Sequence, residues 1–165
     1  MVKLLSLDTS TTTTGYCLYK NARYHQSGIL QPNNGNADLK NMCIMLWYLL
    51  TEINPDIIVI ETPSVTKNAH TQRMLVIVFA VAYIWHILQD KDIFFYPIRP
   101  TEWRKHCSDD EWREKIKKKK RPQLKQLAVE EVKKLFPSVQ LHSDDEAEAI
   151  LIGLAYIHIF DRKEK

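Results

Sequence analysis

The stretch KLLSLDTSTTTTGYCLYK, Lys3–Lys20, decides the fold, because an apolar run ends in an aspartate and a threonine-rich bend then leads into a second apolar run. This pattern predicts two strands, Leu4–Leu7 and Thr14–Tyr19. A third strand is expected at Arg23–Leu30, so the three segments form a β-meander. Asp8 therefore stands at the end of a buried strand, where an ionised carboxylate is unfavourable unless it has a partner.

The rest of the chain alternates between helices and strands. The segment IIVIE at Ile57–Glu61 has four consecutive apolar residues, which is typical of a strand covered on both faces, and it also ends in a carboxylate. This order of elements predicts a mixed α/β fold, and the 165 residues are expected to form one compact domain, 1–165. The other elements expected are, in order, helices at about Ala37–Ile53 and Thr71–Gln89, a strand at Ile93–Ile98, a basic helical region with Pro122 near a helix start, and a helix at about Asp144–Phe160.

Charge is mild overall but unevenly distributed along the chain. The 23 lysines and arginines and the 20 aspartates and glutamates give a formal charge of +3, which by itself does not indicate a nucleic-acid binder. However, KIKKKKR at Lys115–Arg121 places six cations in seven residues, while acids gather at Asp109–Glu111 and Asp144–Glu148. The basic run, with Trp103 and Trp112 nearby, predicts phosphate binding, although a solvated helix face would have the same composition.

Composition argues against several classes of protein. The three cysteines show no C-x-x-C spacing, which argues against a zinc site or a disulfide framework and favours a reducing intracellular compartment. The N-terminus lacks the layout of a secretory signal, because Asp8 interrupts the apolar run. The longest apolar segment, Met74–Leu88, falls short of the ~20 residues that a bilayer requires, so a buried or interfacial helix and no membrane contact are expected.

The start of the last helix carries a cluster of acids. In HSDDEAEAILIGLAY, Ser143 and Glu146 form the pattern of a capping box, and acids in a first turn stabilise a helix through its macrodipole. Capping does not explain Asp145 and Glu148, because helical spacing places both on the face that should pack on the sheet. Two inward carboxylates one turn apart repel each other unless a cation lies between them. A divalent metal ion would supply that cation.

Four carboxylates thus form one candidate metal site, namely Asp8, Glu61, Asp145 and Glu148. All four offer oxygen ligands, which suit Mg²⁺, with Mn²⁺ as a substitute, and argue against zinc. Two such ions about 3.5–4 Å apart can clamp a phosphodiester, one activating water and the other stabilising the leaving oxygen. The set therefore predicts hydrolysis of a nucleic-acid backbone with two Mg²⁺ ions per site, and Asp144 is a further candidate ligand.

Three segments carry a resemblance to a known family: LSLDTSTTTTGYCLY, IVIETPSVTKNA and HSDDEAEAILIGLAY. In this order and at these distances they resemble the RuvC-type Holliday junction resolvases of the ribonuclease H-like superfamily, particularly their shorter phage relatives. The resemblance spans nearly the whole chain. The matching residues are Asp8 with Thr14-Gly15-Tyr16, Glu61 with Lys67-Asn68-Ala69, Asp145 with Glu148-Ala149, and RPTEWRK from Arg99.

The resemblance implies a ribonuclease H-like fold, which is a mixed five-stranded sheet of the three-stranded meander plus two parallel strands, flanked by helices. It implies a metal-dependent endodeoxyribonuclease that acts on branched DNA and resolves four-way junctions by paired nicks, in the cytoplasm of a bacterial or phage-infected cell. The expected catalytic and metal-binding residues are Asp8, Glu61, Asp145 and Glu148. Expected DNA contacts are Lys67, Arg99, Lys117, Lys118, Lys119, Lys120, Arg121 and Lys125, and His142 is a candidate proton shuttle.

The chain departs from the family's pattern at three places. Glu148 stands where bacterial members usually carry a second Asp, and its longer reach is expected to affect the metal preference. Ser64 occupies the position of an aromatic residue that wedges into the junction. The charged SDDEWREKIKKKKR between Arg104 and Lys125 replaces a short glycine-containing loop. The cleavage preference therefore does not follow from the sequence.

The helix expected at Thr71–Gln89 is apolar on nearly all sides, so the sheet cannot cover its whole surface. A two-fold homodimer packed through this helix is expected. In a junction resolvase, two symmetric active sites would cut two opposed strands.

Three alternatives remain open. A nuclease of the same superfamily would act on RNA–DNA hybrids or flaps, and a junction-binding protein would use the acids only structurally. The segment LDTST also resembles the phosphate-binding turn of sugar-kinase and actin-like ATPases and of a tRNA-modification subunit. Those folds need a second domain and a glycine-rich nucleotide loop, and the four glycines of this chain offer neither.

Overall fold

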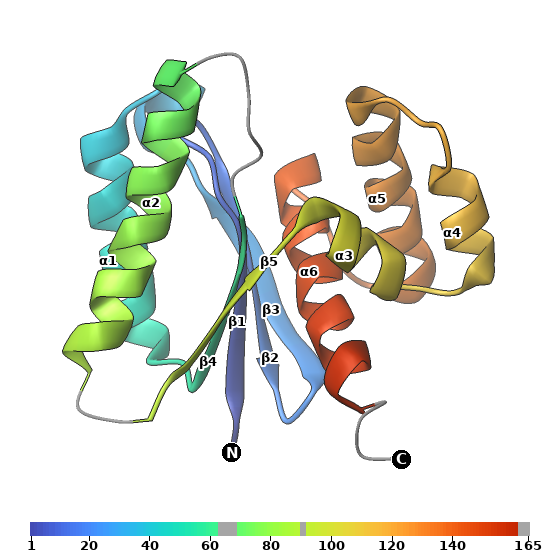
Figure 1. Cartoon of the computed structure of the whole chain (residues 1–165), viewed down its shortest axis with the longest axis horizontal. Coiled ribbons are helices and arrows are strands. Elements are labelled where there is room, and N and C mark those ends of the chain that lie inside the picture. The colour runs from blue at the N-terminus through green and yellow to red at the C-terminus, as the bar shows by residue number, and fades with distance from the viewer. Residues whose placement is uncertain (63–68, 90–91, 162–165) are drawn as a thin grey trace.

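The computed structural model describes residues 1–62, 69–89 and 92–161. Its centre is a five-stranded sheet in the order β3-β2-β1-β4-β5 (Figure 1). β1, β2 and β3 pair antiparallel, whereas β4 is parallel to β1 and β5 is parallel to β4. The expected meander plus two parallel strands is therefore confirmed. The strands are β1 (Lys3–Asp8), β2 (Thr14–Lys20), β3 (Arg23–Leu30), β4 (Ile57–Glu61) and β5 (Phe94–Ile98).

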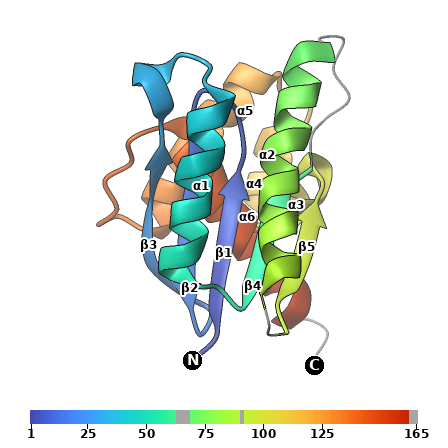
Figure 2. The ribbon, with the colours of Figure 1, turned by 90° about the vertical axis from the view of Figure 1, so that its left-hand side faces the viewer.

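Helices cover both faces of the sheet (Figure 1, Figure 2). One face carries α1 and α2, and the other carries α6 with α3, α4 and α5 around it. The basic helical region expected after β5 consists of three separate helices, α3 to α5. The helices are η1 (Pro32–Gly35), α1 (Leu39–Ile53), α2 (Ala69–Leu88), α3 (Pro100–His106), α4 (Asp110–Ile116), α5 (Arg121–Leu135) and α6 (Asp144–Asp161).

Two hydrophobic layers form the core, one on each face of the sheet. Successive side chains of a strand point to opposite faces, so Leu5 and Leu7 of β1 pack in the layer under α1 and α2, and Leu4 packs in the layer under α6. In β4, Ile58 and Ile60 enter the first layer and Val59 enters the second. Burial on both faces explains why IIVIE is apolar without alternation.

The start of α6 lies directly against the sheet beside the end of β1. Gly15 of β2 pairs with Asp8 of β1, and a Cβ atom added to Gly15 would lie 2.0 Å from the carbonyl oxygen of Asp145. Only glycine permits this approach. One turn further along α6, the buried Ser6 hydroxyl donates to the carbonyl of Ala149 at 2.7 Å. These contacts place the acidic first turn of α6 next to Asp8.

Two tryptophans lie in the core rather than on a DNA-binding surface. Trp103 of α3 and Trp112 of α4 are 0% and 1% exposed and belong to the layer that contains α6. The expectation that they support phosphate binding beside the basic run is therefore wrong. Aromatic rings of this size gain most from burial, and the short helices α3 and α4 each bury one of them against α6 and α5.

Helix α2 buries only part of its surface. Its buried residues are Val78, Ala82 and Trp85. In its most apolar stretch of 18 residues, only 17% of the residues are buried. The helix is 20 residues long with a mean hydropathy of 1.5, and by length and composition alone it would suffice to cross a membrane. The sequence pattern had indicated a segment too short for that. An apolar face is thus left open beside α1.

Candidate active site

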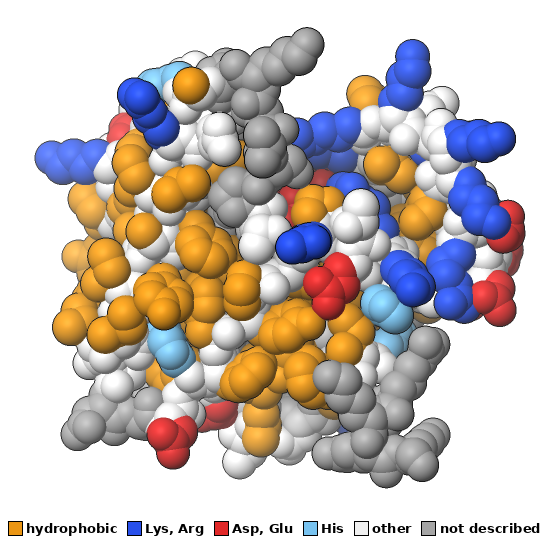
Figure 3. Space-filling model, viewed as in Figure 1, with side chains coloured by type: hydrophobic (Ala, Val, Ile, Leu, Met, Phe, Trp, Pro, Cys, Tyr) orange, Lys and Arg blue, Asp and Glu red, His pale blue; other side chains and the backbone are white. Residues whose placement is uncertain are grey.

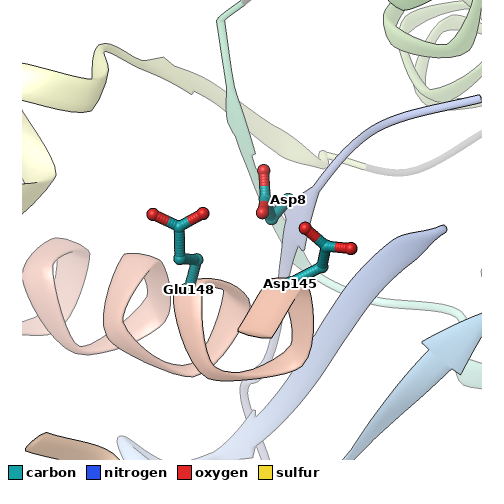
Figure 4. Close-up of side chains that lie close together, drawn as sticks. All are labelled: Asp8, Asp145 and Glu148. Atoms are coloured by element: carbon teal, nitrogen blue, oxygen red, sulfur yellow. The ribbon is translucent and has the colours of Figure 1, made fainter. Parts of the chain in front are cut away.

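Three carboxylates meet where β1 ends and α6 begins. Asp8 comes from β1, and Asp145 and Glu148 come from the first turns of α6 (Figure 4). One oxygen of each lies within 4.8 Å of the other two. This donor set contains only carboxylate oxygens, which are the ligands that Mg²⁺ and Mn²⁺ prefer. The residues present therefore fit a hard divalent cation.

A hydrogen-bond network anchors the start of α6 beside β3. The Ser143 hydroxyl accepts a hydrogen bond from the backbone N–H of Glu146 at 3.0 Å, which confirms the serine half of the predicted capping box. The Glu146 carboxylate is 1% exposed and accepts from the Ser27 hydroxyl at 2.6 Å and from the backbone N–H of His142 at 2.7 Å. Glu146 thus ties α6 to β3, while Asp145 and Glu148 point toward Asp8.

Glu61 occupies the end of β4 in the same pocket, which has a volume of about 440 Å³ and also contains Asp8, Asp145 and Glu148 in its lining. Its carboxylate is not part of the group of mutually close oxygens. The indole N–H of Trp103 donates to Glu61 Oε2 at 2.5 Å. The four predicted carboxylates therefore share one pocket, and three of them are within reach of a single ion.

Two positively charged side chains form ion pairs with these acids. The ammonium group of Lys125 lies 2.6 Å from Asp145 and 3.0 Å from Asp144. The guanidinium group of Arg104 lies 3.0 Å from Glu148. Lys125, which was expected to contact DNA, is thus engaged with the carboxylates. Asp144 stands beside Lys125 at the edge of the cluster.

The acid groups perturb one another because they lie close together in a partly buried pocket. Burial raises the pKa of Asp8 well above its usual value, and the nearby Glu61, Glu148 and Asp145 raise it further, while Lys125 lowers it in part. Burial also raises the pKa of Glu61, and the hydrogen bond from Trp103 opposes that rise. In the absence of a further cation, the neighbouring carboxylates therefore favour the protonated form of Asp8.

The pKa of Lys125 shifts in the opposite sense from that expected of a buried lysine. Burial is the largest single influence and lowers the pKa, but the hydrogen bonds to Asp145 and Asp144 and their negative charges together outweigh burial and raise it. Lys125 consequently stays protonated and acts as a permanent counter-ion at the site.

Of the predicted DNA contacts that the structure describes, one lines the pocket and others are exposed outside it. Arg121 lines it, and Lys117, Lys118, Lys119 and Lys120 are exposed in the connection from α4 to α5. Lysine and arginine side chains gather on this side of the molecule (Figure 3). Arg99 is exposed and precedes α3. Lys67 and Ser64 lie outside the described residues.

His142 is directed toward Glu146 rather than toward the three-carboxylate group. Its Nδ1 lies 3.0 Å from Glu146 Oε2, and its side chain is 64% exposed. It does not line the pocket that holds Asp8. The role of proton shuttle stays a prediction.

Sequence reasoning missed Trp103 and Arg104 as direct neighbours of the carboxylates. A signal was present in RPTEWRK, because these residues follow β5 and the last residue of β5, Ile98, pairs with Glu61. Residues just beyond Ile98 must therefore lie near the end of β4. Helix α3 carries Trp103 and Arg104 into that position.

The sheet order, with helices on both faces, matches a ribonuclease H-like α/β fold. The sequence matches no protein-family model and has no significant match among curated protein sequences. Solved structures are nevertheless similar along the whole chain. They include Thermus thermophilus RuvC in complex with Holliday junction substrate, with a TM-score of 0.71, 9% identity, and coverage of 98% of this chain and 96% of that chain.

Two further resolvases share the fold. The yeast mitochondrial Holliday junction resolvase Ydc2 gives a TM-score of 0.65 at 13% identity, covering 99% of this chain and 80% of that chain. The fowlpox virus Holliday junction resolvase gives a TM-score of 0.63 at 12% identity, and the match covers 94% of this chain and 98% of that chain. The chain therefore has the fold of the RuvC-type resolvases, as the sequence motifs predicted.

Proposed function

We propose that this protein is a metal-dependent endonuclease that resolves four-way DNA junctions by paired nicks. The observation that carries the proposal is the convergence of Asp8, Asp145 and Glu148 within 4.8 Å on this fold. The solved structures with the same fold include resolvases, one of them in complex with a Holliday junction substrate. We further propose that it works in the cytoplasm of a bacterial or phage-infected cell.

Asp8, Asp145 and Glu148, with Glu61 beside them, would hold Mg²⁺ or its substitute Mn²⁺, and we propose two ions per site. When bound, these ions supply activation of water and stabilisation of the leaving oxygen. The protein's own contribution is orientation. β1 and β4 present Asp8 and Glu61 from rigid strand ends, and the capped start of α6 presents the other two.

The cations around the pocket supply affinity for the DNA backbone. Lys117–Lys120 are exposed in the connection that leads into α5, and Arg121 follows in the wall of the pocket. Phosphates bound along this path release counterions, which gives affinity that does not depend on sequence. Arg99, exposed at the start of α3, and Lys67 complete the proposed set of contacts.

The open apolar face of α1 and α2 is proposed to bind a second copy of the chain. Ile84 and Ile87 of α2 are 51% and 62% exposed, and Trp47 and Tyr48 of α1 are 40% and 70% exposed. Figure 3 shows apolar side chains spread over the side of the molecule that carries α2. A stable interface covers roughly 800 Å² on each partner, so the proposed interface uses the exposed apolar residues of both helices. A two-fold dimer would present two active sites to the two opposed strands of a junction.

A substrate panel tests the proposal. The protein is incubated with a four-way junction, a flap, an RNA–DNA hybrid and a linear duplex, each with Mg²⁺, Mn²⁺ or EDTA, and Asp8→Asn serves as the matched control. We expect symmetric nicks in the junction only, dependent on metal and absent in Asp8→Asn. Cleavage confined to the hybrid or flap would assign another ribonuclease H-like activity. Junction binding without cleavage in either metal would make the protein a binding protein.

A further inference from the structure

Trp103 has an unusual place for a core residue. Its ring is 0% exposed and packs in the layer between the sheet and α6. Its polar edge nevertheless reaches the active-site pocket, where the indole N–H donates to Glu61 Oε2 at 2.5 Å. An indole nitrogen can only donate, so this contact restrains the direction of the Glu61 carboxylate.

Trp112 shows that this contact is more than the routine pairing of a buried indole. It belongs to the same core layer and is also buried, but its indole N–H donates to the backbone carbonyl of Arg104 at 2.7 Å. A backbone carbonyl is sufficient to satisfy a buried indole. Trp103 is bonded instead to an acid that lines the pocket.

Arg104 extends the same arrangement to a second acid. Its guanidinium group lies over the Trp103 ring, 4.7 Å from the centroid, and donates to Glu148 Oε1 at 3.0 Å. Two consecutive residues of α3 therefore hold two of the four carboxylates. The start of α3 is fixed in turn by β5, because Ile98 pairs with Glu61 and Pro100 begins the helix two residues later.

We propose that Trp103 is a positioning residue that orients Glu61 for metal binding; this inference rests on the proposed function of the site. One N–H donor occupies one lone pair of one oxygen, so the carboxylate keeps further lone pairs for an ion. A ligand that is already oriented loses less freedom when it binds metal. Partners that orient metal ligands in this way typically contribute 10- to 100-fold to metal affinity.

Metal binding without DNA tests the proposal directly. Titration calorimetry with Mn²⁺ is performed on the wild type, Trp103→Phe and Trp112→Phe, after thermal unfolding has shown that each variant folds. We expect Trp103→Phe to weaken Mn²⁺ binding about 10-fold or more. Trp112→Phe loses a buried indole N–H from the same core layer, and its affinity should stay within about twofold. Equal effects of the two substitutions would overturn the proposal.

A double-mutant cycle separates positioning from a general loss of packing. If Trp103 acts through Glu61, Trp103→Phe should have little further effect on Mn²⁺ affinity in a Glu61→Gln background. Full additivity would show that the indole acts independently of Glu61 and would refute the proposal. A wild type that binds no metal and cuts no junction defeats the proposed function itself, whereas normal cleavage and metal affinity in Trp103→Phe defeats only this inference.

A measurement on the wild type keeps the proposal testable if Trp103→Phe does not fold. The four tryptophans give four indole N–H signals in ¹⁵N-edited spectra, and Trp47→Phe, Trp85→Phe and Trp112→Phe assign three of them. Addition of Mg²⁺ should shift the Trp103 signal, because metal withdraws charge from the carboxylate that it contacts, and should leave the Trp85 signal in place. A Trp103 signal that does not respond to saturating Mg²⁺ would contradict the proposal.

Discussion

Lys125 of α5 holds its ammonium group 2.6 Å from Asp145 and 3.0 Å from Asp144, so an internal cation lies at the carboxylates proposed to bind metal. Its side chain is 22% exposed, which keeps solvent screening limited. Arg104 plays the same part at Glu148. The metal-free protein therefore contains its own partial substitute for a divalent ion.

Removal of this internal cation should make folding depend on metal. Lys125→Met leaves the acids without their counter-ion and should lower the free energy of unfolding in EDTA by about 1–3 kcal/mol. Mg²⁺ should then stabilise the variant more than it stabilises the wild type. Urea unfolding with and without Mg²⁺ measures both effects. Lys117→Met removes an exposed pair with Glu114 and serves as the control; an equal response in both variants would contradict the role of Lys125.

The raised pKa of Asp8 predicts how stability depends on pH in the absence of metal. Because burial and the neighbouring acids raise the pKa of Asp8 in the folded protein, the folded state binds more protons than the unfolded chain. Stability in EDTA should therefore fall as pH rises from the usual Asp value near 3.8 through the raised folded value. Asp8→Asn should flatten this dependence. Urea unfolding at several pH values between about 5 and 8 measures this dependence. If the free energy of unfolding changes with pH equally in the wild type and in Asp8→Asn, the prediction is wrong.

Gly15 should be required for the geometry of the carboxylates. Gly15→Ala places a Cβ atom 2.0 Å from the backbone oxygen of Asp145, so the start of α6 has to shift. Overpacking of this kind costs about 1–3 kcal/mol, and the shift should also weaken Mn²⁺ binding. Gly28→Ala is the matched control, because its nearest contact is the end of the Tyr16 side chain at 2.7 Å. Normal metal affinity in Gly15→Ala would contradict this account of the site.

The basic run should control affinity for DNA of every shape. Replacement of Lys117–Lys120 by glutamine should weaken binding to junction and duplex alike and lower the salt dependence by about 0.9 logarithmic units for each phosphate that the variant no longer neutralises. Fluorescence anisotropy over a range of salt concentrations measures both quantities. Arg23, Lys40, Lys105 and Lys133 are exposed elsewhere, so their replacement by glutamine removes the same four charges and controls for net charge. An unchanged salt slope would show that the run does not contact DNA.

The sequence was sufficient for the strands and for the carboxylates, because both are governed by local rules. An apolar run that ends in an acid marks Asp8 and Glu61 at strand ends, and helical spacing places Asp145 and Glu148 on one side of α6. Both statements hold in the structure. Neither rule requires knowledge of which residues meet across the fold.

The side-chain contacts that orient and neutralise the carboxylates could not be predicted from the sequence in the same way. Trp103 and Lys125 are separated from their partners, Glu61 and Asp145, by 42 and 20 positions. Helix α3 has only seven residues, which is too short for a hydrophobic period to show which face is buried. A tryptophan and a lysine beside a basic run therefore have the composition of a DNA-binding surface. Packing against α6 turns them toward the acids instead.

Assembly of the protein should depend on the exposed apolar face of α2. Ile84 is 51% exposed, whereas Val78 is 0% exposed and faces the core. Ile84→Glu should therefore keep the fold and yield a monomer at micromolar concentration, while Val78→Glu should unfold the protein by burying an unpaired charge. Sedimentation velocity measures the mass, and a cruciform plasmid distinguishes coupled from single nicks. We expect the wild type to be a dimer that cuts both strands in one encounter and Ile84→Glu to leave single nicks. A monomeric wild type that makes coupled cuts would refute the dimer, and partition of the wild type into lipid vesicles, abolished in Ile84→Glu, would assign the apolar face of α2 to a membrane instead.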